Sequence, residues 1–169
     1  MALRYIIILS FVAVYILYGR ELGFTDCSPL WTHLTYPFQH ASIIHLVVNC
    51  LVFFSVSQTM IRLIKPYVLF PIIYIIAVLT SFAAMKDIPT VGASGMIYAV
   101  FGMQTVIVVF NKATAKQKRL FFFGIALMLT VSFFNGGSSF IVHAASFTYG
   151  ALFWLIKRSR EIFSQTSLP

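Results

Sequence analysis

The sequence predicts an all-α membrane protein built as a bundle of six transmembrane helices. Of its 169 residues, 60% are hydrophobic and 9% are charged, whereas a soluble domain carries about 25% charged residues. So little charge cannot cover a surface that faces water. The apolar residues also form continuous runs near the roughly 20 residues that cross a bilayer, without the alternation of a barrel strand. Together these observations predict membrane-spanning helices.

Each predicted crossing is one apolar run. The first run follows Arg4 like a signal-peptide core, but no small-residue cleavage site comes after it, so we expect a retained helix. The fifth run is the shortest and is rich in phenylalanine. No linker, low-complexity tract or repeat divides the chain, so we expect a single domain over residues 1–169. The predicted helices cover residues 3–19, 42–62, 66–84, 93–111, 119–134 and 140–157.

The basic residues predict the orientation of this bundle. One side receives ten of the twelve Lys and Arg residues and the other receives two, Arg20 and Lys86. By the positive-inside rule both termini then face the cytoplasm. The net charge of +8 is therefore mainly a topology signal with some attraction to anionic membrane lipid, and no nucleic-acid partner is expected. The ten cytoplasmic residues are Arg4, Arg62, Lys65, Lys112, Lys116, Lys118, Arg119, Lys157, Arg158 and Arg160.

The acidic residues and cysteines disfavour several functions. No Asp or Glu lies within a predicted helix, which argues against a proton-coupled transporter and an aspartyl intramembrane protease. The sequence contains no HExxH motif for a metalloprotease. Cys27 and Cys50 indicate neither a disulfide nor a metal pair, and the four histidines lack the paired spacing of a haem or zinc site. No metal or other cofactor is expected.

The first of three polar motifs is His45-Leu46-Val47-Val48-Asn49, at the outer end of the second predicted helix. A four-residue spacing puts His45 and Asn49 on one helical face, directed into the bundle. Such a pair can be an interhelical hydrogen bond or part of a functional site, and the motif alone favours neither.

The second motif, Gly92-Ala93-Ser94-Gly95, opens the fourth predicted helix on the outer side. A serine at a helix start is most often a cap. Ser94 also lies where backbone N–H groups are unpaired and the helix dipole is positive, which suits a developing oxyanion. Tyr98 follows one turn later on the same face.

The third motif is His143, near the outer start of the sixth predicted helix. A histidine there can simply be hydrogen-bonded at the interface. However, the small residues Ser146 and Gly150 allow close approach of another helix. If these faces pack, Ser94 and His143 reach similar depth, as a serine nucleophile and its base require. The fourth helix offers a matching small face of Gly95, Ala99 and Gly102.

With these motifs the chain resembles the rhomboid family of intramembrane serine proteases over nearly its whole length. The resemblance implies Ser94 as the catalytic serine, His143 as the general base and Tyr98 as the aromatic residue packed against it. It further implies an oxyanion site formed by the Ser94 backbone N–H with the side chains of Asn49 and His45, supported by Gly92. His40 matches a structural histidine before the second helix.

The implied activity is cleavage of single-pass transmembrane proteins by a Ser–His dyad, without metal. The resemblance also implies a bacterial inner membrane, with the site opening to the outer side. The loop 135–139 is a candidate lid because adjacent glycines rearrange easily. The Phe-rich fifth helix is either a lateral gate or a lipid-facing surface. A non-catalytic relative that binds membrane proteins for quality control is the main alternative.

Three positions depart from the family pattern. Thr32 follows Trp31 where an arginine is common, and Val142 stands where a small residue usually precedes the histidine. The usual Gly-xxx-Gly of the last helix is Ser146-xxx-Gly150 here. None of these departures removes a candidate catalytic group.

Overall fold

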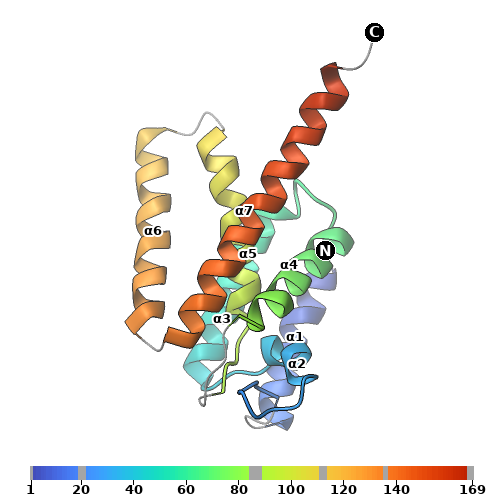
Figure 1. Cartoon of the computed structure of the whole chain (residues 1–169), viewed down its shortest axis with the longest axis vertical. Coiled ribbons are helices and arrows are strands. Elements are labelled where there is room, and N and C mark those ends of the chain that lie inside the picture. Colours follow the sequence, from blue (N-terminus) through green and yellow to red (C-terminus); the bar gives the residue numbers. More distant parts are fainter. Residues whose placement is uncertain (1, 19–21, 84–88, 111–113, 135–136, 167–169) are drawn as a thin grey trace.

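A computed structural model describes residues 2–18, 22–83, 89–110, 114–134 and 137–166, and in these ranges the chain is helical (Figure 1). The prediction of an all-α fold is confirmed there, where the extended pairing is limited to one isolated bridge between Phe24 and Thr90. The elements are α1 (Ala2–Leu17), α2 (Thr32–Thr35), η1 (Tyr36–Phe38), α3 (Ile43–Met60), α4 (Pro66–Ser81), α5 (Ser94–Phe110), α6 (Ala115–Phe134) and α7 (Gly137–Thr166).

Every predicted crossing overlaps one long helix, but the ends of two helices differ. Helix α6 begins at Ala115 and α7 extends from Gly137 to Thr166, so the prediction of a loop over residues 137–139 is wrong. Hydropathy marks the part of a helix that can lie in lipid, whereas Lys, Arg and Gln continue a helix readily beyond it. Serines are also well tolerated near a helix start. The short elements α2 and η1 have no apolar run and were not predicted.

Two helical segments of the described chain, Ile43–Met60 and Phe140–Arg160, are long and apolar enough to cross a membrane. Helices α1, α4 and α5 are also apolar but have 16, 16 and 17 residues. That all six long helices cross the bilayer therefore stays a prediction.

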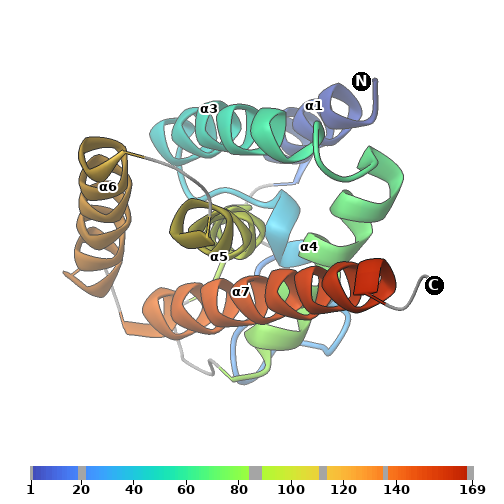
Figure 2. The same ribbon diagram turned by 90° about the horizontal axis from the view of Figure 1, so that it is seen from above.

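Helix α5 lies at the centre of the bundle, with α1 and α3 on one side and α7 on the other (Figure 2). Its residues are buried over most of their length, including Tyr98, Ala99, Val100 and Met103. Helix α6 stands at the edge and packs mainly on α7. The core therefore surrounds α5, and its first residue, Ser94, begins a helix that packs against α3, α4 and α7.

The contact between α5 and α7 depends on glycine at two places. A Cβ atom at Gly102 would overlap the carbonyl oxygen of Phe147, and one at Gly150 would overlap the carbonyl oxygen of Ala99. The backbones of the two helices are thus in direct contact, as small residues permit in membrane bundles. Ser146, in the same stripe of α7, instead reaches α4, with its Oγ 2.7 Å from Oγ1 of Thr80.

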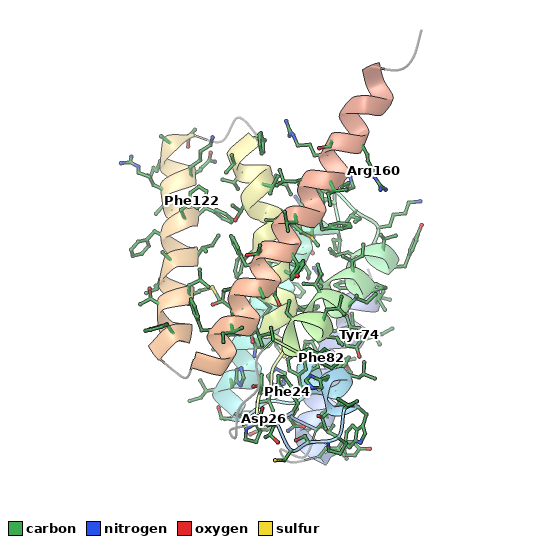
Figure 3. The ribbon with its side chains drawn as sticks, viewed as in Figure 1. Phe24, Asp26, Tyr74, Phe82, Phe122 and Arg160 are labelled. Carbon is green, nitrogen blue, oxygen red and sulfur yellow. The ribbon has the colours of Figure 1, made fainter. Side chains whose placement is uncertain are left out.

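The segment before α5 is attached to η1 and to the loop that contains Phe24, and through Tyr36 to α4. The Gly92 N–H donates to the Tyr36 carbonyl over 2.9 Å, and the Tyr36 hydroxyl donates to the Ala77 carbonyl over 2.9 Å. Phe24 and Thr90 exchange backbone hydrogen bonds of 3.2 and 2.9 Å. Phe24 lies at the same end of the molecule as Phe82 (Figure 3), and the His33 ring stacks on both at 4.5 and 4.0 Å. The start of α5 is thereby fixed in position.

Near the start of α1, Arg4 joins this helix to α3. The side chain is 3% exposed and its guanidinium hydrogen-bonds to Gln58. It also lies 4.0 Å from the centroid of the Phe54 ring, a cation–π distance. Arg4 was predicted only as a cytoplasmic flanking charge, and its burial adds a helix-to-helix contact.

We predict that Gly102→Ala lowers the stability of the bundle, because the added methyl group overlaps the backbone of α7. Overpacking of this kind costs about 1–3 kcal/mol, which thermal unfolding of the detergent-solubilised protein should report as a lower midpoint. Gly124→Ala is the matched control, since no atom lies within 4 Å of a Cβ there. An unchanged midpoint for Gly102→Ala would contradict the close contact of α5 with α7.

Candidate active site

Ser94, the first residue of α5, and His143, in the second turn of α7, are hydrogen-bonded. Ser94 Oγ and His143 Nε2 lie 2.6 Å apart, within the range in which an imidazole can take a hydroxyl proton. His143 is 9% exposed and Ser94 is half-buried. A buried base in contact with a partly accessible hydroxyl is the geometry that makes a serine nucleophilic.

The glycine contacts explain why these side chains meet. Ser94 precedes Gly102, and His143 precedes Gly150, by about two helical turns in each case. Because the backbones touch at the glycines, the two helices are still adjacent at their first turns. The side chains of Ser94 and His143 then bridge the remaining space.

The Tyr98 ring holds the imidazole of His143. The two rings are nearly parallel, with an interplanar angle of 16° and centroids 4.2 Å apart. Tyr98 is 3% exposed and lies one turn after Ser94. Stacking on a ring fixed in the core limits rotation of the imidazole, so Nε2 stays directed at Ser94.

Gly92 brings the turn before Ser94 onto α3. Its φ is +115°, a region that residues with a Cβ rarely adopt. A Cβ there would lie 2.7 and 2.8 Å from Cε1 and Nε2 of His45, and 3.3 Å from Nδ2 of Asn49. The side chains of His45 and Asn49 therefore converge on the backbone just before Ser94, and glycine is required by both conformation and space.

Both convergent side chains can present hydrogen-bond donors. Asn49 is 5% exposed, and its Nδ2 has no hydrogen-bond partner among the described residues. The Ala41 N–H points at Nδ1 of His45 over a long 3.5 Å, so a neutral ring carries its proton on Nε2, on the side of Gly92. The first N–H groups of α5 are further donors without intrahelical acceptors. Such a group of donors suits a negatively charged oxygen.

His40 lies behind this group. It is 1% exposed, donates from Nδ1 to the Phe38 carbonyl over 3.2 Å, and packs against Phe11 and His45 with ring centroids 5.5 and 5.2 Å away. It lies between η1 and α3, outside the helices predicted to cross the membrane. Burial, reinforced by the nearby His45, lowers the pKa of His40 to about 4. Its position is that of a neutral packing residue that supports His45.

Other predicted features have different positions. Gly95 packs closely: a Cβ atom there would lie 2.9 Å from the Tyr36 hydroxyl and 3.5 Å from Cγ1 of Val142. Thr32 is buried and its hydroxyl donates to the Pro29 carbonyl over 2.7 Å. Of the predicted lid, residues 135–136 lie outside the described residues and residues 137–139 are helical. In the described part of the chain no three His, Cys, Asp or Glu residues are grouped to hold a metal.

Helix α6 exposes its aromatic side chains. Phe122 is 40%, Phe123 67% and Phe133 59% exposed, and Phe122 lies on α6 at the edge of the molecule (Figure 3). Both interpretations of this helix, the lateral gate and the lipid-facing surface, require exposed aromatic side chains and stay predictions.

Sequence reasoning missed Tyr36, whose carbonyl and hydroxyl tie the turn at Gly92 to α4. The available signal was a tyrosine directly before a proline, in the segment between the first two predicted helices. The contact itself could not be predicted, because every residue has a backbone carbonyl and residue type does not show which one accepts.

The comparison with known families agrees with this geometry. The family model described as the Rhomboid domain matches residues 28–160, a range that includes both partners of the Ser94–His143 hydrogen bond. The chain is thus a membrane protein of a class whose members are generally intramembrane serine proteases. It belongs to the rhomboid family. A search of curated proteins found no match.

We predict that stability falls as the pH is lowered from 6.5 toward 4, because His40 resists protonation only in the folded state. His40 binds a proton near pH 6.5 in the unfolded chain and near pH 4 in the folded chain. The stability that a neutral His40 contributes is therefore fully present above pH 6.5 and is lost as the pH falls from 6.5 to 4. Between pH 7 and pH 5 the loss from this one group is about 2 kcal/mol.

Unfolding midpoints measured at pH 7 and pH 5 in detergent test this. His40→Phe, which keeps a buried ring, should reduce the difference between the two pH values. If wild type and His40→Phe lost the same stability, the proton would be binding elsewhere.

Proposed function

We propose that this chain is an intramembrane serine endopeptidase in which Ser94 and His143 form the catalytic dyad. The observation that carries the proposal is the 2.6 Å hydrogen bond between Ser94 Oγ and His143 Nε2. Its support is the stacked Tyr98 ring, which orients the imidazole, and membership of a family in which such activity is general. No carboxylate is needed in this scheme, because Tyr98 supplies the orientation that an aspartate gives in a triad.

In the first half of the reaction, Ser94 Oγ attacks the carbonyl carbon of the scissile peptide while His143 Nε2 takes the hydroxyl proton. The tetrahedral intermediate then breaks its C–N bond, and the imidazolium returns that proton to the departing amine. The carboxyl-side product leaves, and the other product remains as an ester on Ser94. In the second half, His143 takes a proton from water, whose oxygen attacks the ester carbon, and Ser94 leaves with the proton.

The oxygen of each tetrahedral intermediate carries a negative charge that needs donors. We assign this role to Nδ2 of Asn49, Nε2 of His45 and the Ser94 backbone N–H. The convergence of the first two on Gly92 and the lack of a partner for Asn49 Nδ2 in the described residues support this assignment. A buried amide without a partner costs about 1–3 kcal/mol, and a reaction intermediate that accepts from it recovers this energy.

The substrates we propose are single-pass transmembrane proteins, in a bacterial inner membrane. In this proposal the whole chain is one six-helix domain with both termini in the cytoplasm, as the ten-to-two distribution of Lys and Arg indicates. Helices α3, α5 and α7 would then place His45, Ser94 and His143 near the outer surface. Water is needed for the second half of the reaction, and it is available at that depth.

We predict that Ser94→Ala and His143→Ala each abolish proteolysis of a model transmembrane substrate, with a loss of at least roughly a thousandfold. A fluorescent fluorophosphonate should label the wild type and neither variant, because it reacts only with an activated serine. Ser159→Ala, which removes an exposed serine of the same helix as His143, is the control and should keep both signals. If the wild type were folded by circular dichroism but did not react with the fluorophosphonate, the result would favour the non-catalytic binding protein instead.

We also predict that Asn49→Ala lowers kcat by about 10²–10³-fold, the usual loss when one oxyanion donor is removed. Because the dyad is unaltered, the fluorophosphonate should still react, although more slowly. Gln104→Ala is the matched control: this amide is also buried, but it donates to the Val56 carbonyl over 3.1 Å. It should lower stability and leave kcat unchanged. An equal fall in kcat for both variants would indicate that Asn49 acts only through folding.

A further inference from the structure

A pocket of about 560 Å³ lies between α4 and α7, at the end of the bundle away from Ser94. Its depth along the bundle follows from one contact and one distance along α7. The guanidinium of Arg158 lies 4.6 Å from the ring centroid of Phe110, the last residue of α5, whereas Ser94 is the first. Along α7, His143 and Arg160 are about 25 Å apart. The lining residues are Ile64, Val68, Ile72, Phe153, Ile156, Lys157 and Arg160.

The lining has two chemically different parts. Five residues are apolar: Val68 and Ile72 of α4, Phe153 and Ile156 of α7, and Ile64 in the turn before α4. Ile156 and Val68 are 56% and 37% exposed. The other two, Lys157 and Arg160, are three residues apart and therefore share a face of α7. Figure 3 shows Arg160 on the part of α7 that lies above α4, toward the C-terminal end. None of the seven lining residues is acidic.

This combination fits one kind of molecule. In a membrane protein the apolar wall faces acyl chains, and its basic end lies where lipid headgroups begin. Basic pockets between transmembrane helices on the cytoplasmic side are suited to anionic headgroups. The volume is in the range of about 300–1,000 Å³ that holds a small ligand.

We propose that this pocket binds one anionic phospholipid of the cytoplasmic leaflet. Lys157 and Arg160 would bind its phosphate, and an acyl chain would lie along Ile64, Val68 and Ile72. The Nζ atom of Lys157 also lies 4.9 Å from the centroid of the Trp154 ring, a cation–π distance. The site is separate from the Ser94–His143 pair, and the proposal does not depend on proteolysis.

Native mass spectrometry of the delipidated full chain in detergent tests the proposal. Phosphatidylglycerol and phosphatidylcholine with identical acyl chains are titrated separately. The wild type should bind the first more tightly. Each basic residue near the headgroup contributes about fivefold in affinity, so Lys157→Gln/Arg160→Gln should weaken phosphatidylglycerol binding about 25-fold and remove the preference. Lys157→Arg/Arg160→Lys keeps both charges and should keep the preference.

Two further variants separate this site from a general effect of surface charge. Lys116→Gln/Arg119→Gln removes two exposed cations from the first turns of α6 and should bind phosphatidylglycerol like the wild type. Val68→Trp fills the apolar part without changing charge and should weaken binding. The proposal is overturned by equal wild-type binding of both lipids, by an equal loss in the α6 variant, or by unchanged binding in Val68→Trp.

Discussion

The backbone contact between α5 and α7 is the constraint on which the rest of the structure depends. It exists because Gly102 and Gly150 leave no side chain between the helices. From this contact the two helices run side by side to Ser94 and His143, and the 2.6 Å hydrogen bond is its consequence. Because α5 also touches α3 and α4, its placement carries His45 and Asn49 to the same point.

The fold class could be predicted from sequence because the apolar runs are long and continuous. The family could be predicted from the resemblance of three short motifs, which contain His45, Ser94 and His143. Helix ends could not be predicted: α7 starts at Gly137 and α6 at Ala115, where polar and charged residues continue each helix beyond its apolar run. For the site, residue types and helix starts indicated Ser94 and His143. The hydrogen bond from Gly92 to the Tyr36 carbonyl was missed, because any residue offers a carbonyl. The catalytic roles themselves remain predictions.

The site combines rigid and unpaired groups. Tyr98, His40 and Tyr36 are almost fully buried and hold their neighbours in place, whereas Nδ2 of Asn49 is buried without a partner among the described residues. The packing of the bundle offsets the cost of leaving that amide unpaired. Donors placed before a charge develops need no reorganisation when it appears, so packing far from Ser94 is part of the chemistry we propose.

The burial of Arg4 has a mechanical consequence for the bilayer. Helix α1 has 16 residues and is about 24 Å long, less than the roughly 30 Å hydrocarbon core. A short helix could slide along its neighbour to centre itself, but the Arg4 contacts with Gln58 and Phe54 fix its height against α3. On the proposed topology the lipid must adapt instead, by thinning around this edge of the bundle.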